Sequence, residues 1–588
     1  VGLSMDAFAV SICKGLAMKK LTVKQAGIVG AWFGGFQALM PTLGYLLGTT
    51  FARFVNAVSD WIAFVLLALI GANMIKEALS KEEEEEADAS LGVKEMFVLA
   101  VATSIDAFAV GVSFACMEIG SMIVPAVLFI GVITFSLSAA GVKVGNVFGT
   151  KYKAKAELAG GIILLLSALL YLKYYNFFAQ NVYRVLEPAG SEFALQAKVL
   201  ILPIGISFYT LQAIGYIVDV YWGKINGLEQ PPGKIALFLG FFPQIMEGPI
   251  SMYSQTADRL WEGNSLKGEN LSKGSVRILW GLFKKMIIAD RLFILVQAVF
   301  EHYENYHGVM IAVAAVAYTV QLYMEFSGCM DIIIGSGRMF GVVLPENFCQ
   351  PFASRNAAEF WRRWHITLGV WFKTYIFYPV SVSVLVKKWN KFGKAYLGKY
   401  ITKLGVSAFC LFPVWLCNGL WHGAKWSYIF YGMYYFTILL AGIALEPVRM
   451  KTVKALHLKE QAFYYRAMQI MKTWIIIFTG ELFFRANGLR VGVRMFRSMF
   501  QNFEVQRLWD GTLLNLGLDK ADYMAILIGC IVVAVVGIIK EKNLLEEGMG
   551  KLHLPVRWAI YYALILAIII FGAYGIGYQQ VDMIYAGF

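Results

Sequence analysis

The sequence is poor in charged residues and in cysteine. Of 588 residues only 15% are Asp, Glu, Lys or Arg, whereas soluble domains carry about 25%. The low charge excludes a soluble enzyme and, together with the high apolar content, a disordered chain. The seven cysteines form no CxxC pair and mostly lie in apolar stretches, which argues against disulfides and against a zinc site. We interpret them as reduced, small apolar side chains.

Long apolar segments are what the sequence has in quantity. Hydrophobic residues make up 58% of the chain, and many runs exceed the ~10 residues of a membrane β-strand. Because lipid offers no partner to an open backbone, such runs must be helices. We therefore expect an all-α, polytopic integral membrane protein. The net charge of +13 sits mostly between apolar runs, so we interpret it as a topology signal and expect no nucleic acid partner.

The first 165 residues contain an internal repeat. SMDAFAV at 4–10 returns as SIDAFAV at 104–110, and GYLLG at 44–48 is followed by GNVFG at 145–149. Each copy holds three apolar spans, so the second copy is inverted, as in many transporters. The expected spans lie near 1–18, 25–50, 58–77, 94–117, 121–149 and 156–175.

Loop charges predict the orientation of these spans. Lysines follow the first, third and fifth spans, so these loops are expected in the cytoplasm and the N-terminus outside. An acidic run at 82–88 lies between the repeats, and we interpret it as a solvated linker. The lysines are Lys19, Lys20, Lys24, Lys76, Lys81, Lys151, Lys153 and Lys155.

Asp6 and Asp106 occupy equivalent positions in two of these apolar helices. A charged residue at the bilayer centre costs about 2.5 to 3.5 kcal/mol on insertion scales, so such groups normally have a function. Inverted repeats bring equivalent residues together near the midplane, and carboxylate oxygens suit Mn²⁺, Mg²⁺ or Ca²⁺. The alternative is a polar contact between helices.

Beyond about residue 176 the repeat motif does not return. Ten further spans are expected, and the second of them is expected to be broken by Pro243, Gly248 and Pro249. The basic stretches 384–403 and 447–466 and the polar segment 487–522 are interpreted as loops. A helix over 154–175 joins the two parts. The ten spans lie near 197–221, 235–255, 276–300, 306–340, 365–385, 403–421, 425–446, 466–484, 523–540 and 555–578.

Two histidines of the second part have polar or glycine-rich neighbours next to apolar spans. His365 ends the segment EFWRRWH at 359–365, and His422 lies in NGLWHG at 418–423. Histidine can deprotonate a hydroxyl near pH 7, and glycine and tryptophan can make room for a ligand and wall it. A histidine satisfied in the core is an equal alternative for His422. Glu359, Arg362 and Arg363 could form an ion-pair network at the membrane interface. The alternative is that they contact the donor substrate of a transfer reaction.

The N-terminal repeat resembles the bacterial manganese efflux pump family. The resemblance rests on GLSMDAFAVSICKGL at 2–16, ATSIDAFAVGVSFA at 102–115 and GVKVGNVFGTKYKAKAELAGGIIL at 141–164. It implies six helices, Mn²⁺ as the transported ion, and metal-site roles for Asp6 and Asp106. Since the chain begins inside the first span, we expect a truncated N-terminus.

The second part is similar to the membrane-bound O-acyltransferase family. The similarity rests on LPIGISFYTLQAIGYIVDVYWG at 202–223, FFPQIMEGPI at 241–250, the segment 322–380 and NGLWHGAKWSYIFYGMYY at 418–435. Within the family it resembles the branch that acylates cell-envelope polymers, which includes alginate O-acetylases and teichoic-acid D-alanyl transfer proteins. Members of this branch have about three further spans before the segment at 173–178, so we expect the first helices of this part to be missing.

This resemblance implies a tunnel through the bilayer, with His422 as catalytic base. His365 would support the tunnel and Trp421 would line it. Asn418 would act as an orienting residue or donate a hydrogen bond to the oxyanion. The donor would be acyl-CoA or an acyl carrier protein, and no tightly bound cofactor is expected. The expected partners are membrane lipid and a cell-envelope polymer or a partner extracytoplasmic acyltransferase.

We therefore expect two domains in the bacterial cytoplasmic membrane, 1–165 and 166–588. The leading function is transfer of an acetyl or D-alanyl group from a cytoplasmic thioester to hydroxyls of an extracytoplasmic polymer. The alternative is Mn²⁺ export through Asp6 and Asp106, alone or as a second activity of the fused chain.

Overall fold

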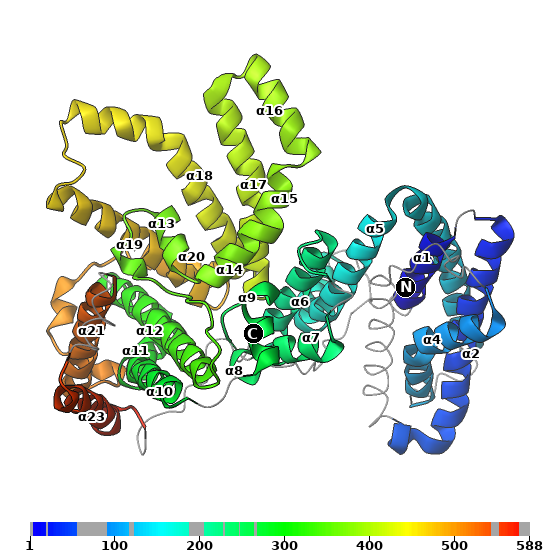
Figure 1. Ribbon diagram of the computed structural model, residues 1–588, viewed down its shortest axis with the longest axis horizontal. Helices are drawn as coiled ribbons and strands as arrows, with labels where there is room; N and C mark the ends of the chain where they lie inside the picture. The colour runs from blue at the N-terminus through cyan, green and yellow to red at the C-terminus, as the bar shows by residue number, and fades with distance from the viewer. Residues whose placement is uncertain are drawn as a thin grey trace. The chain divides into compact units, whose positions relative to one another are not determined.

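The chain folds into helices that group into two units. The computed structural model describes residues 4–18, 21–55, 91–116, 123–186, 205–226, 230–245, 247–263, 267–541 and 552–574. Within these ranges the single extended pairing is an isolated antiparallel bridge between Phe348 and Trp364. Unit 1 comprises residues 1–168 with 217–231, and unit 2 comprises 169–216 with 232–588 (Figure 1). The expected all-α fold is confirmed for the described residues.

Unit 1 contains α1 (Met5–Ala17), α2 (Val23–Val55), α4 (Val93–Cys116) and the first part of α5 (Ile123–Leu186). Its helices cross with their backbones in contact. A Cβ atom added to Gly111 of α4 would lie 2.1 Å from the carbonyl oxygen of Pro41 in α2, and one added to Gly15 of α1 would lie 2.1 Å from that of Val142 in α5. With a repeat offset of about 100 residues, α1 packs on α5 as α4 packs on α2. The repeat seen in the sequence is therefore also a repeat of contacts.

One predicted break in unit 1 is absent. The sequence predicts separate spans at 121–149 and 156–175, but the backbone is helical without interruption through α5. No glycine or proline lies between Gly149 and Gly160, and the intervening Lys, Ala and Glu residues favour helix, so nothing ends it there. The predicted span 58–77, the acidic run 82–88 and Lys19, Lys20, Lys76 and Lys81 lie outside the described residues.

Unit 2 holds the remaining helices, starting with the end of α5 and with α6 (Ile206–Tyr221), which continues past Tyr216 into unit 1. The other helices are α7 (Pro232–Leu239), α8 (Phe242–Ile245), α9 (Tyr253–Glu262), α10 (Gly268–Leu282), α11 (Asp290–Glu301), α12 (Val309–Met339), α13 (Ala357–Arg363), α14 (Ile366–Phe372), α15 (Tyr378–Ser381), α16 (Val384–Tyr396), α17 (Gly398–His422), α18 (Trp426–Ala455), α19 (Phe463–Arg485), α20 (Leu489–Ser498), α21 (Lys520–Glu541) and α23 (Leu554–Phe571). Unit 2 also contains two π-helical turns: η5 (Phe283–Ala289) lies between α10 and α11, and η8 (Lys373–Phe377) lies between α14 and α15.

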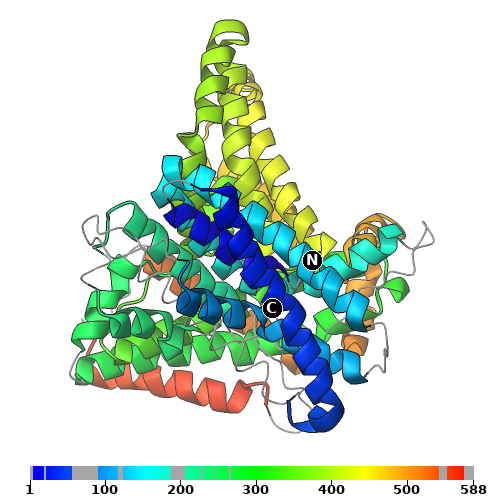
Figure 2. The ribbon, with the colours of Figure 1, turned by 90° about the vertical axis from the view of Figure 1, so that its right-hand side faces the viewer.

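The break predicted at 235–255 is present, because α7, α8 and α9 are three short helices with turns at Gly240 and around Pro249. Two predicted loops are instead helical. The stretch 384–403 forms α16 and the start of α17, and residues 447–455 of the stretch 447–466 continue α18. Lysine is a good helix former, so a basic stretch alone does not indicate a loop. α16 and α17 lie side by side and project from the rest of unit 2 (Figure 2). The segment 487–522 contains α20 and two 3₁₀ turns, η9 (Val505–Leu508) and η10 (Thr512–Leu516).

Seven helical segments among the described residues are long and apolar enough to cross a membrane, or eight if the bent pair Ile366–Ser381 with Val384–Tyr396 forms one span. The seven are Ile123–Asn146, Val309–Met339, Gly398–His422, Trp426–Ala455, Phe463–Arg485, Lys520–Lys540 and Leu554–Phe571. The protein is therefore a multi-pass membrane protein, as the sequence predicts.

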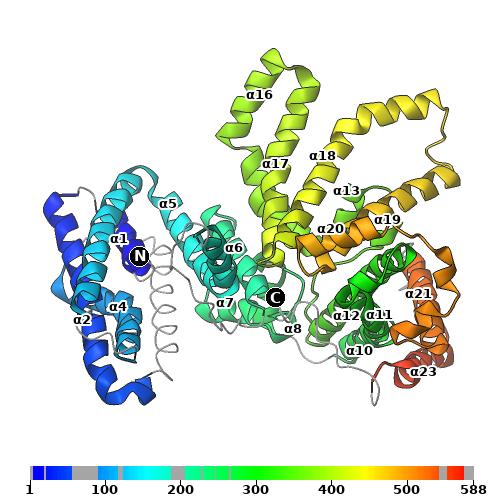
Figure 3. The same ribbon diagram turned by 180° about the vertical axis from the view of Figure 1, so that it is seen from behind.

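Buried charges hold the centre of unit 2 together. Lys284 Nζ lies 2.5 Å from Asp331 Oδ2 of α12 and 3.0 Å from Ser327 Oγ. Arg277 of α10 pairs with the same aspartate at 3.0 Å and donates two hydrogen bonds of 2.5 and 2.6 Å to Glu346. Lys284 and Asp331 are buried. α12 packs against α10, α11 and α19 and is the central helix, as Figure 3 shows from behind.

Candidate functional site

His422 is the last residue of α17, and its position depends on two glycines. Gly423 follows with φ 150° and ψ 179°, a conformation that essentially only glycine adopts, so the helix ends at the histidine. Four residues before Gly423, a Cβ atom on Gly419 would lie 2.4 Å from the carbonyl oxygen of Tyr428. α17 and α18 therefore touch through their backbones next to His422, and no larger side chain fits between them.

Aromatic rings from three helices enclose the His422 side chain, which is 5% exposed. Its ring centroid lies 5.0 Å from that of Trp421 on α17 and 4.9 Å from that of Phe484 on α19. The ring of Tyr431 on α18 stands 5.8 Å away at 88°. The imidazole thus sits at a helix end in an apolar enclosure, where hydrogen bonds and charges act more strongly than in water.

His365 is the second buried histidine and is held differently. It precedes α14 with a left-handed φ of 47°, and its Nδ1 lies 3.3 Å from Oδ1 of Asn347. The same Asn347 oxygen accepts hydrogen bonds from the backbone N and the hydroxyl of Thr367, at 3.0 and 2.9 Å. The His365 ring lies 5.6 Å from the ring of Trp421. Trp421 therefore contacts both histidines that the sequence singled out.

The end of α5 closes the C-terminal end of α17. Lys173 Nζ donates to the carbonyl oxygen of Trp421 at 2.8 Å and to Ser207 Oγ at 2.9 Å. The hydroxyl of Tyr174 donates to the carbonyl oxygen of Leu420. The last carbonyls of a helix need such donors, so these two residues fix the backbone on which His422 stands. Sequence reasoning missed them; the available signal was a lysine within an apolar span.

Asn418 lies one turn before His422 on α17 and is 6% exposed. Its Oδ1 atom has no hydrogen-bond partner in the part of the chain that the structure describes, and neither does Nε2 of His365. Buried polar atoms are nearly always paired with protein, water or ligand. Two unpaired polar atoms on residues around His422 are therefore compatible with a bound ligand.

The charged residues before His365 form a local pair. Glu359 and Arg363 of α13 make an i,i+4 ion pair at 3.0 Å. The Glu359 carboxylate also accepts from the backbone N of Arg355 at 3.0 Å, and Asn356 caps the helix. Arg362 is exposed. The interfacial ion-pair interpretation therefore accounts for Glu359 and Arg363.

Glu481 of α19 is a further buried polar residue, which sequence reasoning missed. It is 1% exposed, and its Oε1 accepts a hydrogen bond of 2.9 Å from the hydroxyl of Tyr431. The signal was available, since Glu481 is a lone carboxylate in the predicted span 466–484, the same feature that singled out Asp6 and Asp106.

The predicted metal residues of unit 1 are described only in their backbones. Asp6 lies in α1 and Asp106 in α4, but their side chains fall outside the described part. Close by in sequence, Ser4 Oγ lies 2.8 Å from Thr134 Oγ1 of α5, and Gln37 of α2 donates to the carbonyl oxygen of Thr103 at 2.8 Å. No group of three His, Cys, Asp or Glu residues that could hold a metal ion occurs among the described residues.

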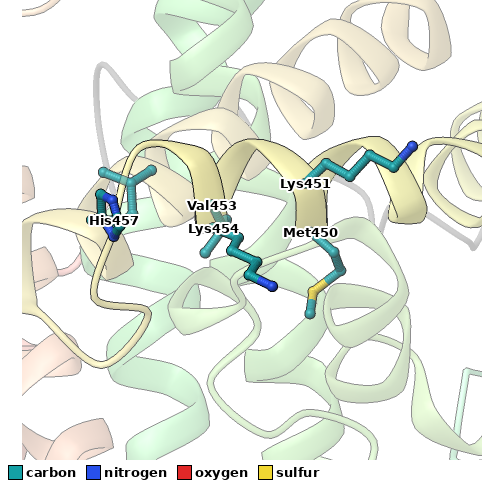
Figure 4. A pocket seen from close by; sticks show the side chains of 6 residues that line it. Met450, Lys451, Val453, Lys454 and His457 are labelled. Carbon is teal, nitrogen blue, oxygen red and sulfur yellow. The ribbon is translucent and has the colours of Figure 1, made fainter.

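Unit 2 also has a surface hollow, which lies away from His422. It is formed at the C-terminal end of α18 (Figure 4), whereas His422 lies beside the N-terminal end of that helix. The hollow therefore does not belong to the histidine site. Its lining residues are Met450, Lys451, Val453, Lys454, His457 and Leu458.

The protein is thus a helical, multi-pass membrane protein in which aromatic rings enclose a buried histidine at the end of a helix. The family model "MBOAT, membrane-bound O-acyltransferase family" matches residues 231–485. A "Probable alginate O-acetylase" of Pseudomonas syringae pv. tomato is 33% identical over 373 residues, which cover 63% of this chain and 66% of the relative. One of Azotobacter vinelandii is 31% identical over 402 residues, covering 68% of this chain and 73% of the relative.

The N-terminal part matches a different family. The model "Putative manganese efflux pump" covers residues 20–172. A protein with this description from Acetivibrio thermocellus is 55% identical over 165 residues, which cover 28% of this chain and 82% of the relative. One from Desulfitobacterium hafniense is 57% identical over 169 residues, covering 29% and 88%.

The chain belongs to the membrane-bound O-acyltransferase family, and it carries an N-terminal domain of the manganese efflux pump family. Both resemblances noted in the sequence are thereby confirmed, as are the acyltransferase class and the membrane localisation, and the relatives named above are bacterial. The boundaries 1–165 and 166–588 and the roles of the site residues stay predictions.

Proposed function

We propose that unit 2 transfers an acyl group, acetyl or D-alanyl, from a thioester donor to hydroxyls of an extracytoplasmic cell-envelope polymer, with His422 as the base. One observation carries the proposal: an imidazole at a helix end lies in an aromatic enclosure, and the side-chain oxygen of Asn418, one turn away, has no hydrogen-bond partner in the described part of the chain. Coenzyme A or a carrier protein would deliver the acyl group, and the acceptor would be the polymer itself or a partner acyltransferase.

The chemistry assigned to His422 is proton transfer. Its imidazole takes the proton of the acceptor hydroxyl while that oxygen attacks the thioester carbonyl carbon. The new C–O ester bond forms, the C–S bond breaks, and the imidazolium returns its proton to the departing thiolate. Asn418 would orient the acceptor or donate its amide N–H to the oxyanion. His365, fixed by Asn347, would hold the Trp421 ring against the base.

Replacing His422 by alanine and measuring the acyl content of the envelope polymer in cells tests this function. We expect acylation to be lost because the variant has no imidazole at the end of α17 to accept the proton. His457→Ala is the matched control, since this histidine is exposed and lies at the far end of α18. Unchanged acylation by a His422→Ala protein present at normal levels would rule the proposal out.

Mn²⁺ export through Asp6 and Asp106 is the second candidate function, alone or beside acyl transfer. The equivalent packing of α1 on α5 and of α4 on α2 favours it, because such a repeat would bring the two carboxylates to equivalent positions. We expect Asp6→Asn and Asp106→Asn each to raise cellular manganese and sensitivity to it. Normal manganese tolerance in both variants would contradict export.

A further inference from the structure

Glu481 is a buried carboxylate that the proposed reaction leaves without a role. Tyr431 donates to its Oε1 at 2.9 Å, whereas Oε2 has no hydrogen-bond partner in the described part of the chain. A carboxyl group in an apolar membrane helix is costly and is usually retained for a function. The plain structural alternative is a hydrogen bond that ties α19 to α18.

Tyr431 and Phe484 connect Glu481 to the candidate base. Phe484 lies three residues after Glu481, on the same face of α19. Its ring centroid is 4.9 Å from that of His422 and 4.9 Å from that of Tyr431. Tyr431 in turn stands edge-on to His422 at 5.8 Å. The hydrogen bond to Glu481 therefore fixes a ring that contacts the imidazole.

The surroundings of Glu481 offer hydroxyls rather than cations. A Cβ atom on neighbouring Gly480 would lie 2.4 Å from Oη of Tyr435, so that hydroxyl sits against the same turn of α19. Tyr435 Oη is buried and has no hydrogen-bond partner in the part of the chain described. An acceptor on Glu481 and a donor on Tyr435 are therefore left over in the described part of the chain.

We propose that Glu481 is a positioning residue of the acyl-transfer site. Through the hydrogen bond from Tyr431 it holds that ring edge-on to His422, so that the imidazole keeps one orientation when it takes the acceptor proton. This inference rests on the proposed function of His422. In the described part of the chain, the titratable groups next to His422 are His365 beside α14, Lys173 of α5, and Tyr428 and Tyr431 of α18.

The test compares Glu481→Gln, Glu481→Asp and Tyr431→Phe in membranes that contain the full-length chain. Acetyl-CoA and a D-alanyl carrier protein are each offered to the wild type with polymer from the same cells, and the donor that supports transfer is used throughout. We expect Glu481→Gln to weaken the hydrogen bond from Tyr431 and to lower kcat about tenfold, the order of one hydrogen bond, with KM within about twofold.

Glu481→Asp restores part of kcat, and Tyr431→Phe, which removes the hydrogen bond altogether, lowers kcat at least as much as Glu481→Gln does. Glu446→Gln, on the exposed far part of α18, is the matched control and leaves kcat unchanged. Wild-type kcat in Glu481→Gln overturns the inference; if that variant does not accumulate, wild-type kcat in Tyr431→Phe does so. An inactive His422→Ala beside a normal Glu481→Gln refutes this inference alone, whereas an active His422→Ala refutes the proposed function.

Discussion

Different kinds of contact hold the helices together inside unit 1 and inside unit 2. In unit 1 helices cross backbone to backbone at glycines, and the contact of α4 with α2 repeats that of α1 with α5. In unit 2 polar side chains are buried at helix ends and inside the core, as with Lys173 on Trp421 and Lys284 on Asp331. The repeat in unit 1 gives Asp6 and Asp106 equivalent positions in the fold. Unit 2 has no such repeat, and its two buried histidines, His365 and His422, have different neighbours. Substitutions should therefore damage one unit and spare the other.

We expect Lys284→Met to show the largest difference between its effects on unit 2 and on unit 1. This change leaves Asp331 buried with one cationic partner fewer, and breaking a buried ion pair costs about 3 to 5 kcal/mol. We expect less folded unit 2 and less acyl transfer, with manganese tolerance retained. Quantifying full-length protein and polymer acylation in the same cells checks this. Normal acylation would show that the buried pair does not hold unit 2 together.

A substitution in unit 1 should produce the reverse pattern. Gly111→Ala puts a methyl group 2.1 Å from the Pro41 carbonyl oxygen, and such overpacking costs about 1 to 3 kcal/mol. Gly27→Ala is the control, because nothing lies within 4 Å of the added Cβ. We expect manganese tolerance to fall only in Gly111→Ala, with acylation unchanged in both. Equal tolerance in the two variants would argue against close helix crossing in unit 1.

Lys173→Met tests whether the end of α5 positions the base. Losing the hydrogen bonds to the Trp421 carbonyl at the end of α17 and to Ser207 of α6 should cost about 1 kcal/mol each. We expect a several-fold lower kcat with a normal protein level, since His422 loses its fixed backbone. Lys425→Met, a few residues beyond His422 and exposed, should have no such effect. Full activity in Lys173→Met would mean that α17 needs no cap from α5.

The smallest effect concerns Glu346, which is outside the spans. Burial raises the pKa of Glu346, but the hydrogen bonds and charge of Arg277 lower it more, so the net pKa lies below its usual value. Its contribution to stability is then present above about pH 4.3, the unperturbed value, and is lost as the pH falls through the lowered pKa. Thermal melts of wild type and Glu346→Gln should differ at pH 7 and converge as the pH falls through the lowered pKa of Glu346. A constant difference would contradict the assignment.

The sequence predicted the helical spans of unit 2, the break before Tyr253 and both buried histidines, because apolar length and residue type carry these features locally. It missed the helix α16 and the continuity of α5, since lysine-rich stretches resemble loops in composition while favouring helix. It also missed Lys173 and Glu481 as neighbours of the site. Lys173 contacts Trp421 across 248 residues of chain, and pairings at such separations follow from packing, which a local pattern does not contain. Asp6 and Asp106 were singled out as carboxylates at equivalent repeat positions in apolar helices, and their role stays a prediction.

The central claim is that His422 is the base of an acyl transfer that does not depend on unit 1. Membranes carrying the wild type, His422→Ala, His457→Ala or the double variant Asp6→Asn/Asp106→Asn would be supplied with a labelled acyl thioester, and label in the polymer measured. The account predicts a rate at least about 100-fold lower in His422→Ala, with the other two variants within about twofold of the wild type. Transfer at the wild-type rate by a normally abundant His422→Ala protein would contradict it.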